Sequence, residues 1–91
     1  MKTETYKQGA ELDSFNYQQV QDDILAILSG GASVVLDMTA CNYISSTGLR
    51  VLLYSKKVAA TKRLKICLSG ISDEVKDIMD VTGFSNFFDY A

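Results

Sequence analysis

The stretch that decides the fold is ASVVLDMTACNYISSTGLRVLLYSKKVAA, residues 32–60. It opens with an apolar, mostly β-branched run that ends at Asp37, and such a run predicts a buried strand. Farther on, apolar residues recur at helical spacing, at Leu49, Leu52, Leu53, Ala59 and Ala60. The sequence therefore predicts a strand that leads into a helix through a short polar loop.

The start of this predicted helix carries three consecutive hydroxyl groups, on Ser45, Ser46 and Thr47. The first N–H groups of a helix lack an intrahelical acceptor, and the aligned peptide dipoles leave about half a positive charge there. The plain interpretation is that one hydroxyl caps the helix and the other two are solvated. The sharper interpretation is a phosphorylation switch, because a phosphoserine carries about −1.5 to −2 charges and a helix N-terminus tolerates them.

Length and composition predict one globular domain over residues 1–91, with 47% hydrophobic and 22% charged residues. The net charge is −2 and the nine basic residues are scattered, which argues against nucleic-acid binding. The first residues lack the apolar core of a signal peptide, and no apolar run approaches the ~18 residues that span a bilayer. We therefore expect a cytoplasmic protein without membrane insertion.

The residue types present disfavour catalysis. Histidine is absent, so the usual general base of nucleophilic catalysis and the commonest metal ligand are both missing. Cys41 and Cys67 lack CxxC spacing and are predicted to be reduced core residues. We therefore expect no catalytic residue, no metal ion and no cofactor.

Upstream of the central stretch, residues 3–9 are short and polar and predict at most one edge strand. A helix follows, with Asp13 or Ser14 as its expected cap and a glycine pair, Gly30 and Gly31, at its end. Its predicted apolar face comprises Tyr17, Val20, Ile24, Ile27 and Leu28.

Downstream, Leu64, Ile66 and Leu68 alternate with Lys65 and Cys67, which predicts a strand with one covered and one partly open face. A third helix is then expected, and the residues assigned to it are Ser72 as its cap, Val75, Ile78 and Met79 on its inner face, and Gly83 beyond its end. The closing aromatic residues are predicted to seal the core; they are Phe84, Phe87, Phe88 and Tyr90.

The alternation of helices and strands predicts parallel strands joined by right-handed crossovers, with helices packed on the sheet. Ligands and partners tend to meet such sheets at the carboxyl ends of the strands. Residues 38–48 leave the central strand at that edge. This placement is independent support for a functional site at the start of the second long helix.

Three segments of the sequence carry a family resemblance. They are residues 35–38 with residues 43–53, the segment Glu11-Leu12-Asp13, and Val75 and Ile78 with residues 82–84 and 87–88. Together they span residues 9–88 and resemble the anti-sigma factor antagonist family, the bacterial STAS domain. The resemblance implies an α/β fold with a small mixed, mostly parallel sheet, helices packed on it and a shortened N-terminal strand region.

The resemblance implies a non-catalytic protein that binds an anti-sigma factor with serine kinase activity. In the family, phosphorylation of one serine breaks that complex, and a serine phosphatase resets it. The matching residue is Ser46, with Ser45 and Thr47 as neighbouring candidates because Ser45 stands where the family usually has Asp. The partner-binding surface is expected to comprise Asn42, Tyr43, Ser45, Ser46, Thr47, Gly48 and Arg50.

Two of these expected partner-binding residues have more than one interpretation. Arg50 lies one helical turn beyond Ser46, so it either holds the phosphate or belongs to a solvated helix face. Gly48 either lets a partner backbone approach closely or only allows a tight helix start.

The sequence departs from the family in two further places. Only a dozen residues precede Asp13, so a sheet edge should be exposed, and a homodimer through that edge is one expectation. The connection through residues 61–63 lacks the glycine expected between a helix and the next strand, which predicts a tight turn.

Two alternative functions remain open from the sequence. One is a scaffold subunit of a transport or signalling complex, in which Ser46 is only a helix cap. The other is a nucleotide-binding module, which the absence of a GxxxxGK[ST] loop disfavours.

Overall fold

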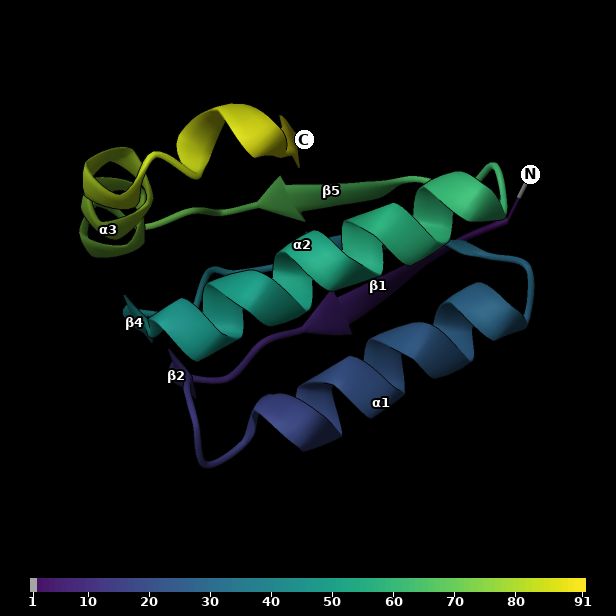
Figure 1. Cartoon of the computed structure of the whole chain (residues 1–91), viewed down its shortest axis with the longest axis horizontal. Coiled ribbons are helices and arrows are strands. Elements are labelled where there is room, and N and C mark those ends of the chain that lie inside the picture. The colour runs from purple at the N-terminus through teal and green to yellow at the C-terminus, as the bar shows by residue number, and fades with distance from the viewer. Residues whose placement is uncertain (1) are drawn as a thin grey trace.

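The computed structural model describes residues 2–91, so Met1 of the predicted domain lies outside the described residues. Its elements are β1 (Thr3–Lys7), β2 (Glu11–Leu12), α1 (Tyr17–Ser29), β3 (Ser33–Asp37), β4 (Tyr43–Ile44), α2 (Ser46–Thr61), β5 (Ile66–Ser69), α3 (Asp73–Thr82), a short 3-10 helix η1 (Ser85–Phe87) and β6 (Asp89–Tyr90). Figure 1 shows their arrangement. The predicted order of three helices and two central strands is confirmed.

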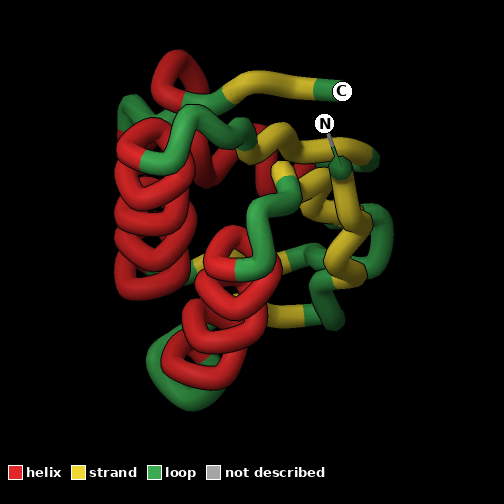
Figure 2. The backbone as a smooth tube through the Cα atoms, turned by 90° about the vertical axis from the view of Figure 1, so that its right-hand side faces the viewer, coloured by secondary structure: helices red, strands yellow, loops and turns green. Residues whose placement is uncertain are grey.

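The main sheet has four strands in the order β1-β3-β5-β6, and all of its pairings are parallel. β1 lies at one edge, as predicted, with Thr3 opposite Ser33 and Lys7 opposite Asp37. Figures 1 and 2 show α1 and α2 side by side on one face of this sheet. The fold class predicted from the sequence is confirmed.

The core lies between that sheet face and the two helices. Alternation along the strands points Val34 and Leu36 inward, while Val35 and its neighbour Cys67 stay half-buried on the outer face. The inner positions meet the buried face of α1, formed by Val20, Ile24 and Leu28, and that of α2, which includes Leu49 and Leu52. One covered face accounts for the half-open strand predicted at residues 64–68.

Two short strand pairings were not predicted. β2 pairs in parallel with β4, so that Glu11 lies opposite Tyr43 and Leu12 lies opposite Ile44. β6 pairs with the edge of β5. Leu12 and Ile44 are both buried, so the small β2–β4 sheet closes one end of the core.

The predicted cap of α1 is wrong. The helix begins after Asn16, which makes no side-chain cap bond. Asp13 instead organises the preceding turn, because its Oδ1 accepts hydrogen bonds from the backbone N–H groups of Phe15 at 2.9 Å and Asn16 at 3.2 Å. By contrast, the predicted cap of α3 is confirmed: Ser72 accepts from the backbone N–H of Val75 at 3.2 Å.

The aromatic residues near the C-terminus seal the core only in part. Phe88 is buried and Phe84 packs against the core from a partly buried position. Phe87 and Tyr90 are each about half exposed, at 52% and 51%. The prediction that all four close the core is therefore wrong for these two.

Candidate functional site

The three hydroxyls at the start of α2 have different environments. Ser45 is the N-cap, and its Oγ accepts a hydrogen bond from the backbone N–H of Gly48 at 3.1 Å. Ser46 is the first residue of the helix and is exposed, whereas Thr47 is half-buried. The alternative in which Ser46 caps the helix is therefore wrong, because Ser45 occupies that position.

Gly48 faces the interior of the protein. A Cβ at this position would lie 2.7 Å from the backbone oxygen of Leu12 and 2.9 Å from Cγ1 of Ile44. The missing side chain lets the β2–β4 sheet approach α2. The expectation that Gly48 contacts a partner backbone is therefore wrong, since the residue is buried against its own chain.

The segment before α2 presents Asn42 and Tyr43 to solvent, and Tyr43 is 48% exposed. The buried residue Cys41 holds this segment in place, because its Sγ donates a hydrogen bond to the backbone oxygen of Tyr43 at 3.3 Å. Burial raises the pKa of the Cys41 thiol, so the thiol keeps the proton that this bond requires. The Ser72 hydroxyl in turn donates to the Cys41 oxygen at 3.1 Å, which fixes the segment to the start of α3.

Arg50 is exposed on α2, one turn beyond Ser46. It lines a hollow of about 430 Å³ between α1 and α2. The other residues that line it are Ser14, Tyr17, Gln21, Thr47, Val51 and Tyr54. The hollow thus brings Thr47 and Arg50 together with the start of α1.

The structure gathers most of the predicted residues at one end of the molecule, where β2, β4 and the start of α2 meet at the left of Figure 1. Asn42, Tyr43, Ser46 and Arg50 are exposed there, and Ser45 and Thr47 are half-buried. Sequence analysis did not place the turn between β2 and α1 at this end of the molecule, where the β2–β4 pairing brings it. The available signal was Phe15, an apolar residue outside any helical or strand periodicity, whose side chain is 96% exposed.

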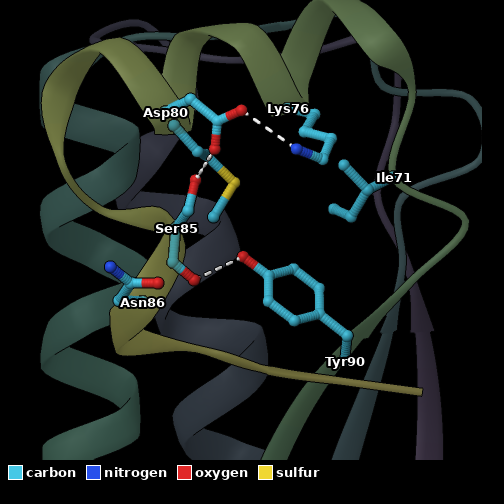
Figure 3. Close-up of a pocket in the computed structure, with 7 residues that line it drawn as sticks. Ile71, Lys76, Asp80, Ser85, Asn86 and Tyr90 are labelled. Carbon is cyan, nitrogen blue, oxygen red and sulfur yellow. Dashed lines mark hydrogen bonds and ion pairs between the residues drawn. The ribbon is translucent and has the colours of Figure 1, made fainter.

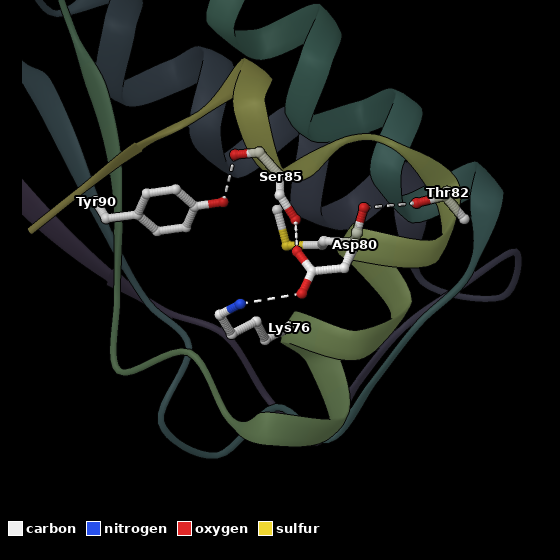
Figure 4. Close-up of polar contacts among 6 residues, drawn as sticks. Lys76, Asp80, Thr82, Ser85 and Tyr90 are labelled. Atoms are coloured by element: carbon white, nitrogen blue, oxygen red, sulfur yellow. Dashed lines mark hydrogen bonds and ion pairs between the residues drawn. The ribbon is translucent and has the colours of Figure 1, made fainter.

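A second hollow, of about 370 Å³, lies between α3 and the C-terminal segment (Figure 3). Its polar side chains bind one another, as Figure 4 shows: Lys76 Nζ is 3.0 Å from Asp80 Oδ2, the Ser85 hydroxyl donates to Asp80, and Tyr90 donates to the Ser85 backbone oxygen at 2.7 Å. The bonds from Ser85 and Lys76 lower the pKa of the Asp80 carboxyl. The Ser85–Asp80 bond joins the C-terminal segment to α3, whereas the Lys76–Asp80 pair lies within α3 and the Tyr90–Ser85 bond lies within the C-terminal segment.

Residues 2–91 contain no group of three or more His, Cys, Asp or Glu side chains placed to hold a metal ion. Among these residues, none of the helices combines the length and the apolar composition that a membrane span requires.

The structure is a small α/β domain with a parallel sheet, two helices on one face of that sheet, and an exposed serine at the first position of the second helix. The family model described as "STAS domain" matches residues 5–90, and the chain belongs to that family. The resemblance predicted from the sequence is confirmed.

Individual relatives agree with this assignment. The chain is 31% identical over 81 residues to the putative anti-sigma factor antagonist BtrV of Bordetella bronchiseptica (strain ATCC BAA-588 / NCTC 13252 / RB50), covering 88% of this chain and 70% of that protein. The fold of this chain is similar to that of the anti-sigma factor antagonist SpoIIAA in its unphosphorylated form, with a TM-score of 0.81 and 17% identity. The match covers 99% of this chain and 80% of SpoIIAA.

The fold also occurs in a protein that is named for a transporter family. A sulfate transporter family protein from Wolinella succinogenes matches with a TM-score of 0.72 at 20% identity, over 93% of this chain and 70% of that one. The fold is therefore shared by proteins whose descriptions differ, and it does not by itself define a role.

Proposed function

We propose that this chain is an anti-sigma factor antagonist that binds an anti-sigma factor with serine kinase activity and is released when Ser46 is phosphorylated. The observation that carries the proposal is the division between two adjacent serines. Ser45 caps α2, and Ser46 is exposed at its first position. The 31% identity to a putative anti-sigma factor antagonist supports the same role.

A phosphate on Ser46 would leave the fold intact. The cap bond from Gly48 to Ser45 does not involve the Ser46 side chain, and a dianion is favourable beside the first N–H groups of a helix. Ser45 is a poorer acceptor because its half-buried hydroxyl is engaged in the cap. Thr47 is also half-buried and lines the hollow between α1 and α2.

The phosphate acts on the complex through charge. A dianion within a protein interface must be desolvated and would repel acidic groups of the partner. A loss of about 3 kcal/mol of binding free energy lowers the affinity more than a hundredfold. The antagonist itself needs no conformational change, and a serine phosphatase restores binding by removing the charge. We propose that the chain catalyses no reaction of its own and acts in the cytoplasm.

The test uses a purified candidate anti-sigma factor with serine kinase activity from the same organism. We expect ATP to transfer one phosphate to Ser46, located by intact mass and phosphopeptide mapping, and Ser46→Ala to abolish that transfer while retaining binding. Ser46→Asp should weaken binding more than a hundredfold by calorimetry. Ser29→Asp, a matched change at an exposed serine at the far end of α1, should leave the affinity within twofold.

Transfer to Ser45 or Thr47, or full binding by Ser46→Asp, would contradict the mechanism. If the chain bound no anti-sigma factor and carried no phosphate in its own cells, the role of a scaffold subunit in a transport complex would be favoured instead. The fold shared with the Wolinella protein is the observation behind that second candidate.

A further inference from the structure

Phe15 is an apolar side chain with no structural role in its own domain. At 96% exposure it is more accessible than Val81, at 87%, or any other large apolar residue recorded among residues 2–91. It lies in the turn between β2 and α1, outside the buried face of either element. Folding therefore gains almost nothing from a phenylalanine at this position.

The backbone under Phe15 is held by a reciprocal set of hydrogen bonds. Asp13 Oδ1 accepts from the N–H groups of Phe15 and Asn16, and Asn16 Oδ1 accepts from the N–H of Asp13 at 2.9 Å. Asn16 Nδ2 also donates to the backbone oxygen of Glu11 at 2.7 Å. The ring thus projects from a fixed base, so little backbone freedom remains to be lost on binding.

The same turn is joined to the start of α2. The backbone N–H of Ser45 donates to the Leu12 oxygen at 2.9 Å, and Leu12 lies opposite Ile44 in the β2–β4 pairing. Ser14, next to Phe15, lines the same hollow as Thr47 and Arg50. A partner that covers the first turn of α2 therefore also meets this turn.

We propose that Phe15 is the anchor residue of the partner interface and inserts into an apolar pocket of the anti-sigma factor. This inference rests on the proposed function and names a side chain whose truncation should weaken binding strongly. Exposed aromatic side chains on preorganised turns have the properties of interface hot spots. Arg50, on the other side of the hollow, calls for an acidic group beside that pocket.

The two contacts together explain why a phosphate at Ser46 would be effective. The acidic group that pairs with Arg50 would face a dianion one helical turn away. The ring of Phe15 brings the two proteins together, and charge at Ser46 then decides whether they stay together.

The experiment measures calorimetric affinity for the same purified anti-sigma factor, with Phe15→Ala compared to wild type. We expect Phe15→Ala to weaken binding at least about 30-fold. Phe15→Leu should recover part of the loss because it restores apolar area. The matched control is Val81→Ala, a truncation of an exposed apolar residue in the last turn of α3, which should stay within twofold.

A kinetic readout separates an anchor from a residue with a merely structural role. Phe15→Ala should raise the KM of the kinase for this chain at unchanged kcat, and its thermal unfolding should match that of wild type. If wild type binds and Phe15→Ala binds within twofold of it, the anchor role is overturned and the proposed function stands. If wild type itself does not bind, the proposed function fails, and the anchor role fails with it.

Discussion

At the scale of single residues, the roles of Ser45 and Gly48 at the start of α2 depend on hydrogen bonds and contacts that the sequence does not show. Three adjacent hydroxyls are equivalent in a sequence, but only Ser45 adopts the extended backbone and accepts the cap bond. Gly48 is the second such case. From the sequence, Gly48 could face solvent or a partner at the start of the helix. In the structure, the atoms nearest to a Cβ at this position belong to Leu12, which is far away in the chain.

Replacing Gly48 by alanine tests this close approach. Alanine favours helix by about 1 kcal/mol over glycine, but here its Cβ would meet the Leu12 backbone oxygen at 2.7 Å. Overpacking of this kind costs about 1–3 kcal/mol, so we expect Gly48→Ala to lower the free energy of unfolding in urea. Gly9→Ala is the matched control, because nothing lies within 4 Å of its added Cβ and it should be nearly neutral. Equal midpoints for the two variants would show that β2 yields to the methyl group.

Tyr6 provides a pH-dependent test. Its hydroxyl donates to Asp23 Oδ2 at 2.9 Å, which ties β1 to α1, and burial together with the bond and charge of Asp23 raises the pKa of Tyr6 to about 12. The unfolded phenol ionises near pH 10, so the folded state holds this proton more tightly. The stabilisation is therefore complete below pH 10 and is lost as the pH rises from about 10 to 12.

Tyr6→Phe should remove this part of the pH dependence. We expect the variant to lose about 1 kcal/mol at neutral pH with the hydrogen bond, and to show a flatter decline in stability between pH 10 and 12. Denaturation followed at several pH values would measure both effects. An unchanged slope in that range would mean that other groups cause the alkaline loss.

At the scale of elements, all three helices end in the same motif. In each, the backbone N–H of a residue with positive φ donates to the carbonyl oxygen three residues earlier. The backbone N–H of the next residue donates to the carbonyl oxygen five residues before it. The positive-φ residues are Gly31 at 86°, Arg63 at 58° and Gly83 at 79°. The tight turn predicted after α2 is thus confirmed, and an arginine occupies the position that glycine fills in the other two helices.

Arg63→Gly should stabilise the protein. A left-handed backbone costs a non-glycine residue about 1–2 kcal/mol, and part of that gain is offset by the greater freedom of glycine in the unfolded chain. We expect a net increase of about 0.5–1 kcal/mol in the free energy of unfolding, measured in urea. Arg63→Ala is the control, since it removes the same side chain but keeps the strain. A gain of equal size in both variants would assign the effect to the side chain.

Elements also show where sequence prediction succeeds and fails. The helices and the central strands were predicted because each buries a periodic apolar face, as at Val34 and Leu36 or at Val75 and Met79. The β2 and β4 strands contain two residues each, which is too few to show an alternation of apolar and polar residues. They are strands only because they pair with each other. The turn that carries Phe15 is placed beside the start of α2 by this pairing, so the sequence did not predict that position.

At the scale of the whole molecule, the main sheet ends at β1 on one side and at the two-residue strand β6 on the other, so β1 is its longer edge strand. The residues on either side of β1 form backbone hydrogen bonds with β3. The N–H of Ser33 donates to the carbonyl oxygen of Lys2, and the N–H of Gln8 donates to that of Asp37. Because bonding alternates along a strand, the backbone N–H of Thr5 points away from β3. We therefore expect the homodimer predicted from the sequence to form through this edge.

Sedimentation tests that dimer. We expect a concentration-dependent dimer for wild type and a monomer for Thr5→Pro, because proline removes an outward N–H and spares the bonds to β3. Circular dichroism of the variant checks that the fold is retained. A wild-type chain that sediments as a monomer at every concentration would rule out association through β1.

The division between Ser45 and Ser46 has a consequence for how such a domain can evolve. Selection for a stable fold acts on Ser45, whose cap is worth about 1 kcal/mol, and is nearly blind to Ser46. Under the proposed function, one substitution at position 46 would therefore add or remove the phosphorylation site without a compensating change elsewhere. Domains with this arrangement would then be free to diverge in regulation while the capping position stays under the same folding constraint.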